Sequence, residues 1–194
     1  MPFRLRQPEC LSRPPRHPRH RAADRCNFPL RACAARRYLQ ADQQPAVAVP
    51  NIPNKLRYMQ IETERFIRRH GITEFSFNPH FPVNTLLLMR GAVAAQMEGL
   101  LDSYVAAVMH HMWEEPKKMD DPAIVAAALT QSGLDARRLL ELAQSPDVKQ
   151  RLVDNTARSV ERGSFGAPTF FVGAEIYFGK DQLGEVEVEI RCTT

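Results

Sequence analysis

The stretch Gly163–Asp181, GSFGAPTFFVGAEIYFGKD, contains two β-rich runs separated by a short turn. Thr169–Val172 and Glu175–Tyr177 are rich in aromatic and β-branched residues, and Gly173-Ala174 lies between them. Two such runs joined by a two-residue linker that contains glycine are typical of a β-hairpin. Asp181 is a suitable N-cap for a helix that continues to residue 190. The stretch therefore predicts a hairpin followed by a closing helix, the two together spanning about residues 168–190.

The residues before this stretch predict a helical subdomain over about residues 84–162. The apolar residues of these segments recur at intervals of three and four, which is the period of an amphipathic helix. The expected elements are a helix over Lys55–His70 that Gly71 ends, an edge strand at Phe75–Phe77, one long helix from the cap Asn84 through Met112, and helices that begin at Asp121-Pro122, Asp135 and Ser145-Pro146.

Residues 1–50 differ in composition from the rest of the chain. They contain ten Arg and only three acidic residues, and they hold eight of the 15 Pro and three of the four Cys. Proline removes backbone donors and interrupts helices, so this segment predicts no folded domain. We interpret residues 1–50 as a basic Pro/Arg-rich segment, either disordered or translated in a shifted reading frame, and residues 51–194 as the folded domain.

Two other interpretations of the basic segment remain open. Its arginines suit an arm that binds nucleic acid or another polyanion, although no known binding module is visible. A zinc site from His17, His20, Cys26 and Cys33 is disfavoured, because six residues separate the two cysteines and zinc ligands usually come in closer pairs. Neither nucleic acid nor a metal is therefore the expected partner.

Overall composition indicates a globular chain. Of its 194 residues, 44% are hydrophobic and 25% are charged, and no apolar run reaches the 18 residues of a membrane span. The first ten residues lack the apolar core of a secretory signal. We therefore expect a cytoplasmic protein without a membrane partner.

Gly166-Ala167-Pro168-Thr169-Phe170 resembles the cis-proline loop of DsbA-like and kappa-class glutathione transferase proteins. The resemblance implies a cis bond between Ala167 and Pro168, whose exposed backbone pairs with the cysteinyl unit of glutathione. Phe178-Gly179-Lys180-Asp181 is similar to the F-G-x-D turn that contacts glutathione in the 2-hydroxychromene-2-carboxylate isomerase family. The alternatives are an ordinary strand-opening proline and a plain N-cap at Asp181.

The segment Asn78–Thr85, NPHFPVNT, resembles the N-P-x-F-P-x-N-T segment of the same family, and Arg90 follows it on an apolar helix as it does there. The resemblance implies that Asn84 and Arg90 contact an aromatic organic acid. It covers about residues 50–190. It implies an α/β thioredoxin-like (DsbA-like) fold with an inserted helical subdomain and with an N-terminal β-α-β half that is missing or aberrant here.

One part of the family pattern is not found. Family members begin with a strand that leads to a Ser which holds the glutathione sulfur, and Ser12 is only a weak substitute for it in this chain. No C-x-x-C pair is present, so a dithiol oxidoreductase is not expected. The catalytic residue is therefore unknown at this stage.

The resemblance implies a glutathione-dependent isomerase of aromatic catabolism, active or inactive, that acts on 2-hydroxychromene-2-carboxylate. The alternatives are a kappa-class-like glutathione transferase and a non-catalytic remnant with a basic arm. A homodimer is left open. His110-His111 is expected to pack at a surface or an interface rather than to bind a metal, because adjacent helical residues point about 100° apart.

Overall fold

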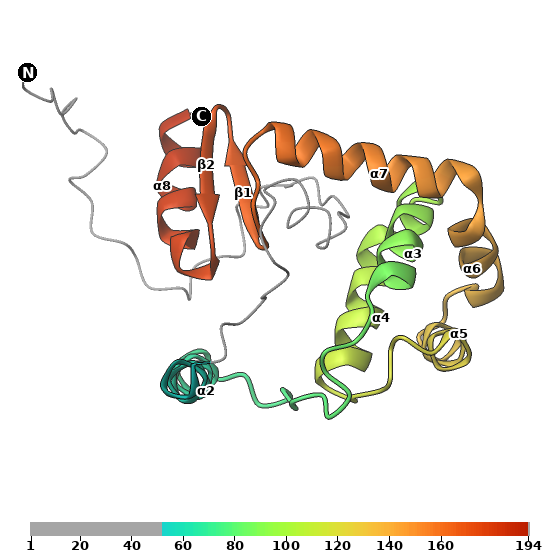
Figure 1. Cartoon of the computed structure of the whole chain (residues 1–194), viewed down its shortest axis with the longest axis horizontal. Helices are drawn as coiled ribbons and strands as arrows, with labels where there is room; N and C mark the ends of the chain where they lie inside the picture. The colour runs from blue at the N-terminus through green and yellow to red at the C-terminus, as the bar shows by residue number, and fades with distance from the viewer. Residues whose placement is uncertain (1–51, 194) are drawn as a thin grey trace, which may run out of the picture. The chain divides into compact units, whose positions relative to one another are not determined.

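The computed structural model describes residues 52–193, which fall into two compact units, 52–165 and 166–193. The first unit is helical, and the second contains a two-stranded hairpin and a closing helix (Figure 1). The first unit contains the helices α2 (Pro53–His70), α3 (Leu86–Met97), α4 (Leu101–Trp113), α5 (Pro122–Gln131), α6 (Ala136–Gln144) and α7 (Pro146–Glu161). The second unit contains β1 (Thr169–Val172), β2 (Glu175–Phe178), the 3-10 helix η2 (Lys180–Gln182) and α8 (Leu183–Thr193). No helix among residues 52–193 is long and apolar enough to cross a membrane.

Three helix starts follow the capping chemistry that the sequence predicts. The Asp121 carboxylate accepts the Ala123 N–H at 2.9 Å, and Asp135 accepts the Arg138 N–H at 2.9 Å. The Ser145 hydroxyl accepts the Val148 N–H at 3.3 Å. Each side chain satisfies an N–H group that has no partner within its helix, which stabilises the helix by about 1 kcal/mol.

The long helix expected from Asn84 through Met112 is wrong, because the chain forms two helices there. α3 ends at Met97 and α4 begins at Leu101, and Gly99 between them has a φ of 73°. The Leu100 N–H returns to the Ala95 carbonyl at 2.8 Å, which closes the turn. A left-handed glycine ends a helix readily, and the chain then folds back so that α3 and α4 lie side by side (Figure 1).

The edge strand expected at Phe75–Phe77 is also wrong, because no strand forms among these residues. The Ser76 N–H donates to the Trp113 carbonyl at 2.6 Å, so this segment pairs with the end of α4 instead. The rings of Phe75, Phe77 and Phe81 surround Trp113 with centroid distances of 5.7–6.3 Å. The aromatic residues therefore form a side-chain cluster rather than a strand.

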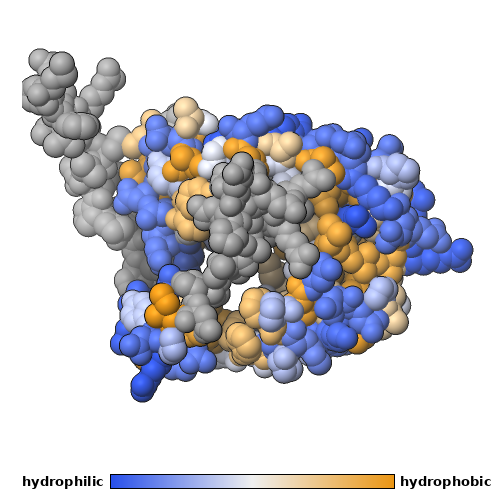
Figure 2. All heavy atoms as spheres, viewed as in Figure 1, coloured by the Kyte–Doolittle hydropathy of each residue, from blue (hydrophilic) through white to orange (hydrophobic). Residues whose placement is uncertain are grey.

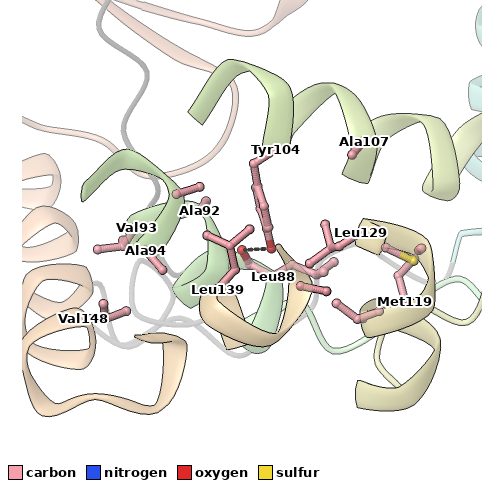
Figure 3. Close-up of a cluster of buried hydrophobic side chains, with 14 of the residues drawn as sticks. Leu88, Ala92, Val93, Ala94, Tyr104, Ala107, Met119, Leu129, Leu139 and Val148 are labelled. Carbon is pink, nitrogen blue, oxygen red and sulfur yellow. Dashed lines mark hydrogen bonds between the residues drawn. The ribbon is translucent and has the colours of Figure 1, made fainter. Parts of the chain in front are cut away.

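The core of the first unit lies where α3 packs against α4, α6 and α7. The run of small residues at positions 91–95 of α3 is fully buried, so the neighbouring helices approach α3 closely. The Tyr104 hydroxyl of α4 donates to the Leu88 carbonyl at 3.0 Å (Figure 3), and a Cβ added at Gly91 would collide with that phenol. Other side chains of this core are Val93, Met119, Val125, Leu129, Leu139 and Val148.

Hydrophilic residues predominate on the outer faces of α6 and α7. Figure 2 shows mainly hydrophilic residues along the upper right of the molecule, where α6 and α7 lie in Figure 1. The pattern follows from amphipathic helices whose apolar faces meet in the core.

His111 is the largest polar side chain that lies fully within this unit, and 1% of it is exposed. Burial, together with the nearby Lys117 and His110 charges, lowers its pKa. We expected the His110-His111 pair to pack at a surface or an interface. His110, with 39% of its side chain exposed, lies at the surface, whereas His111 is buried in the interior.

Candidate functional site

The hairpin brings the two glutathione-associated motifs of the sequence to one place. β1 and β2 pair antiparallel, with Thr169 opposite Phe178. The pairing extends one step further, because the Gly179 N–H donates to the Pro168 carbonyl at 2.9 Å. Ala167-Pro168 and the Gly179–Asp181 turn therefore lie side by side at the open end of the hairpin.

The bond between Ala167 and Pro168 is cis, as the resemblance implied, and both residues are exposed. Two contacts fix the loop before this bond. The Thr169 hydroxyl donates to the Gly166 carbonyl at 2.6 Å. The Phe178 ring covers Gly166 so closely that an added Cβ would lie 2.8 Å from its Cε2 atom. The backbone of Ala167 is thus presented to solvent by a fixed loop.

The Gly179 backbone adopts φ 95° and ψ 156°, a conformation that is essentially restricted to glycine. It lets the chain turn from β2 directly into η2. The Lys180 ammonium donates to an Asp181 carboxylate oxygen at 2.9 Å, and 80% of the Asp181 side chain is exposed. A peptide-like ligand at this end of the hairpin would meet a backbone edge and a pair of opposite charges.

Asp181 does not cap the closing helix as expected. It lies within η2, and α8 begins two residues later at Leu183. Because its carboxylate accepts no helix N–H, this side chain is left to solvent and to the neighbouring Lys180.

Asn84 and Arg90 lie in one pocket of about 240 Å³ in the helical unit. Asn84 does not occupy the N-cap position of α3, which is Thr85, but its side-chain oxygen accepts the Leu86 N–H at 3.1 Å. Arg90 is half-buried, and within residues 52–193 its guanidinium makes no hydrogen bond or ion pair. The remaining lining residues are Leu86, Leu87, Asp120, Pro122 and Gln144.

Asp120 is a pocket residue that the sequence did not reveal. One of its carboxylate oxygens accepts the Asn84 N–H at 3.4 Å. The other is buried and has no hydrogen-bond partner within the part of the chain that the structure describes. Asp120 directly precedes Asp121, which caps α5. Because the sequence pattern here indicated only the start of a helix, it did not point to Asp120 as a pocket residue.

The segment Asn78–Thr85 is held in place by a buried amide. Asn78 is fully buried, and its NH₂ group donates to the carbonyls of Met112 at 3.1 Å and Lys117 at 2.9 Å. Its oxygen accepts the His80 N–H at 2.9 Å. Asn78 therefore ties the segment that leads to the pocket onto the end of α4, which is a structural role.

Several sequence-based candidates lie outside the described residues. These are Ser12, the alternative zinc set His17, His20, Cys26 and Cys33, and the domain boundary at residue 50. They remain predictions. Ala167, Pro168, Phe178, Gly179, Lys180 and Asp181 belong to the unit 166–193, whereas Asn84 and Arg90 belong to the unit 52–165.

A thioredoxin-like protein is the class that the hairpin, its cis-proline loop and the preceding helices define. The chain belongs to the family of DsbA-like thioredoxin domains, whose family model matches residues 33–191.

Within that class, the chain is similar to the 2-hydroxychromene-2-carboxylate isomerase of Pseudomonas putida, with 27% identity over 135 residues, 69% of this chain and 64% of the relative. It is also similar to the isomerase of Sphingobium xenophagum, with 26% identity over 133 residues, 69% of this chain and 67% of the relative. The chain thus spans 61–67% of the length of the relatives that it matches.

A solved structure of 2-hydroxychromene-2-carboxylate isomerase shares the fold. It aligns with a TM-score of 0.71 and 23% identity over 84% of this chain and 79% of that chain. The thioredoxin-like fold and the resemblance to these isomerases are therefore confirmed.

Proposed function

We propose that this chain is a cytoplasmic, glutathione-binding isomerase homologue that takes a small aromatic organic acid of the 2-hydroxychromene-2-carboxylate type. The observation that carries the proposal is the open end of the hairpin, where the exposed Ala167 backbone lies beside the Gly179–Asp181 turn. The relatives named as isomerases support the class of reaction.

The hairpin end fits glutathione group by group. The exposed Ala167 backbone offers the N–H and C=O that a cysteinyl unit needs for strand-like pairing. The Asp181 carboxylate, 80% exposed, suits the ammonium of the γ-glutamyl group, and the Lys180 ammonium suits its carboxylate. When bound, glutathione would supply a thiol that adds reversibly to a conjugated carbon and allows rotation about the former double bond.

The pocket in the helical unit fits the other reactant. The Arg90 guanidinium is a strong partner for a carboxylate, which it can bind through two parallel hydrogen bonds. Leu86, Leu87 and Pro122 supply apolar wall for an aromatic ring. The Arg90 cation suits the carboxylate of an aromatic acid, and the Asp120 oxygen that has no partner within the described residues suits a hydroxyl group of the same ligand.

Titration calorimetry of the full-length chain with reduced glutathione tests the proposal. We expect binding that Asp181→Asn weakens by about 10- to 100-fold, because a charged hydrogen bond is lost. The control Asp154→Asn, an exposed acid on α7, should bind as the unaltered chain does. A titration without heat of binding up to high glutathione concentrations would exclude the proposal.

A second measurement separates binding from catalysis. Conversion of 2-hydroxychromene-2-carboxylate is followed by absorbance with and without glutathione. Glutathione-dependent turnover supports the isomerase. Activity only on an electrophile such as chlorodinitrobenzene would assign a transferase instead, and binding without any turnover would assign an inactive homologue.

A further inference from the structure

Two histidines and a glutamate converge where α4 ends. Nε2 of His110 lies 3.6 Å from a Glu115 carboxylate oxygen, and Nδ1 of His111 lies 4.0 Å from the same oxygen. One ligand atom from each of the three residues lies within 4.8 Å of the others. Glu115 follows His111 by four residues, the spacing of neighbours on a helix, and the turn after Trp113 brings it near His110 as well.

The hydrogen bonds of His111 orient a lone pair toward this cluster. Its Nδ1 atom lies 3.0 Å from the Lys117 ammonium, which can only donate, so Nδ1 must be the acceptor. The proton of the neutral ring is then on Nε2, which donates to the Ser132 hydroxyl at 3.1 Å. Metal-binding histidines have this arrangement, in which the far nitrogen donates to a fixed partner.

His110 is held in a similar way. Its Nδ1 atom lies 2.7 Å from a Glu114 carboxylate oxygen, which leaves Nε2 to face Glu115. A carboxylate on the far nitrogen fixes the ring and raises the basicity of the near nitrogen in many metal sites. Both imidazoles are thus oriented by partners outside the cluster.

The cluster already attracts a positive charge. The Lys117 ammonium lies 3.0 Å from His111 Nδ1 and 3.7 Å from Glu115, and it donates to the Gln131 side-chain oxygen at 2.7 Å. His110 and Glu115 have 39% and 53% of their side chains exposed, so an ion can reach them from solvent.

We propose that His110, His111 and Glu115 bind a divalent transition-metal ion of the zinc type in competition with the ammonium of Lys117. Two imidazoles and one carboxylate are the ligand types of such an ion, and water would complete the four positions. Tetrahedral zinc with bonds of about 2.0–2.1 Å holds its ligand atoms about 3.3 Å apart. The observed separations of 3.6 Å, 4.0 Å and up to 4.8 Å are longer, so binding an ion requires the exposed His110 and Glu115 side chains to move closer to His111. None of the three residues belongs to the unit that carries the proposed glutathione contacts.

Titration of the full-length chain with ZnCl₂ in a non-chelating buffer tests the proposal. His110→Ala and Glu115→Gln each remove a ligand, and Glu114→Gln removes only the outer partner of His110. The outer-partner variant should bind zinc about tenfold more weakly, and the two ligand variants should lose more than that. Lys117→Met should bind zinc more tightly than the unaltered chain, because it removes the competing charge.

Controls exclude other ligands and unfolding. His80→Ala removes an exposed histidine that is not one of the three ligands and should leave zinc affinity unchanged, and circular dichroism should show equal helix content in every variant. Co²⁺ in place of Zn²⁺ should give a spectrum without thiolate charge-transfer bands, since no cysteine takes part. Zinc affinity that is unchanged in both ligand variants, or that Lys117→Met fails to raise, overturns the proposal.

Discussion

The two units of the molecule differ in how they are stabilised. The helical unit has a continuous core, with fully buried side chains such as Leu129 and Leu139. In the hairpin unit, Val186 is the one residue that is buried among residues 166–192. The proposed glutathione contacts all lie in this less buried unit. The described part of this unit is one two-stranded hairpin with a single helix, which encloses too few side chains to form a core of its own.

Shortening a buried side chain of the helical core should lower the free energy of unfolding far more than shortening an exposed side chain of the hairpin. Leu139→Ala should destabilise the protein by about 2–5 kcal/mol, because it leaves a cavity among packed helices. Ile176→Ala on β2 removes a side chain that is already 41% exposed and should cost much less. Urea unfolding followed by circular dichroism measures both, and equal losses for the two variants would contradict the difference in burial.

The pocket of the helical unit is tested by Arg90→Met, which keeps an unbranched apolar stem and removes the charged guanidinium. Affinity for an aromatic carboxylate should fall by about 1.5–3 kcal/mol, the contribution of a charged hydrogen bond. Glutathione affinity should stay the same. Arg137→Met on α6 is the control, because it removes an 89% exposed arginine that pairs only with Glu141. An unchanged affinity for the acid in Arg90→Met would remove Arg90 from the site.

Gly179→Ala in the hairpin unit tests the glutathione contacts, as Arg90→Met tests the contact with the acid. The backbone at φ 95° and ψ 156° is strained for any residue with a Cβ, at a cost of about 1–3 kcal/mol. We expect glutathione affinity to fall while affinity for the aromatic acid is retained. Gly173→Ala, in the turn between the strands, is the control for hairpin stability. If both glycine variants lose glutathione equally, the effect comes from the hairpin and not from the turn at Gly179.

The smallest expected effect is at a helix cap. Ser145→Ala should destabilise the helical unit by about 1 kcal/mol, because the Val148 N–H loses its acceptor. Ser145→Asp should restore most of this loss, since Asp is also a good cap. Thermal unfolding of the three proteins checks the order, and a destabilised Ser145→Asp variant would argue against capping as the cause.

Local chemistry made part of this structure predictable from sequence. Asp121, Asp135 and Ser145 each satisfy nearby N–H groups, and this interaction depends only on residues three or fewer positions away. The hairpin also depends on local pairing around its turn. The two strands of the hairpin and these three helix starts were therefore predicted almost at their observed bounds.

Longer-range features were not predictable in the same way. The apolar stripe runs on across Gly99 and so hides the turn that this glycine makes between α3 and α4. Phe75 and Phe77 look like strand residues, yet contacts with Trp113, far along the chain, decide their structure. Asp120 lies 36 residues after Asn84 in the sequence, and the structure alone shows that its carboxylate accepts the Asn84 N–H and lines the same pocket. Asn84 and Arg90 themselves were found by family resemblance rather than by physical pattern.

The close crossing of α3 and α4 at Gly91 bears on how this pocket can change. Arg90 and Leu87 stand on α3 next to a position where even a methyl group would strike the Tyr104 ring. A rotation of α3 at this crossing would drive it into Tyr104, so the α3 side of the pocket has little room to move. Under the proposed function, a different preference among acids should therefore come from replacing lining residues such as Leu86 or Gln144.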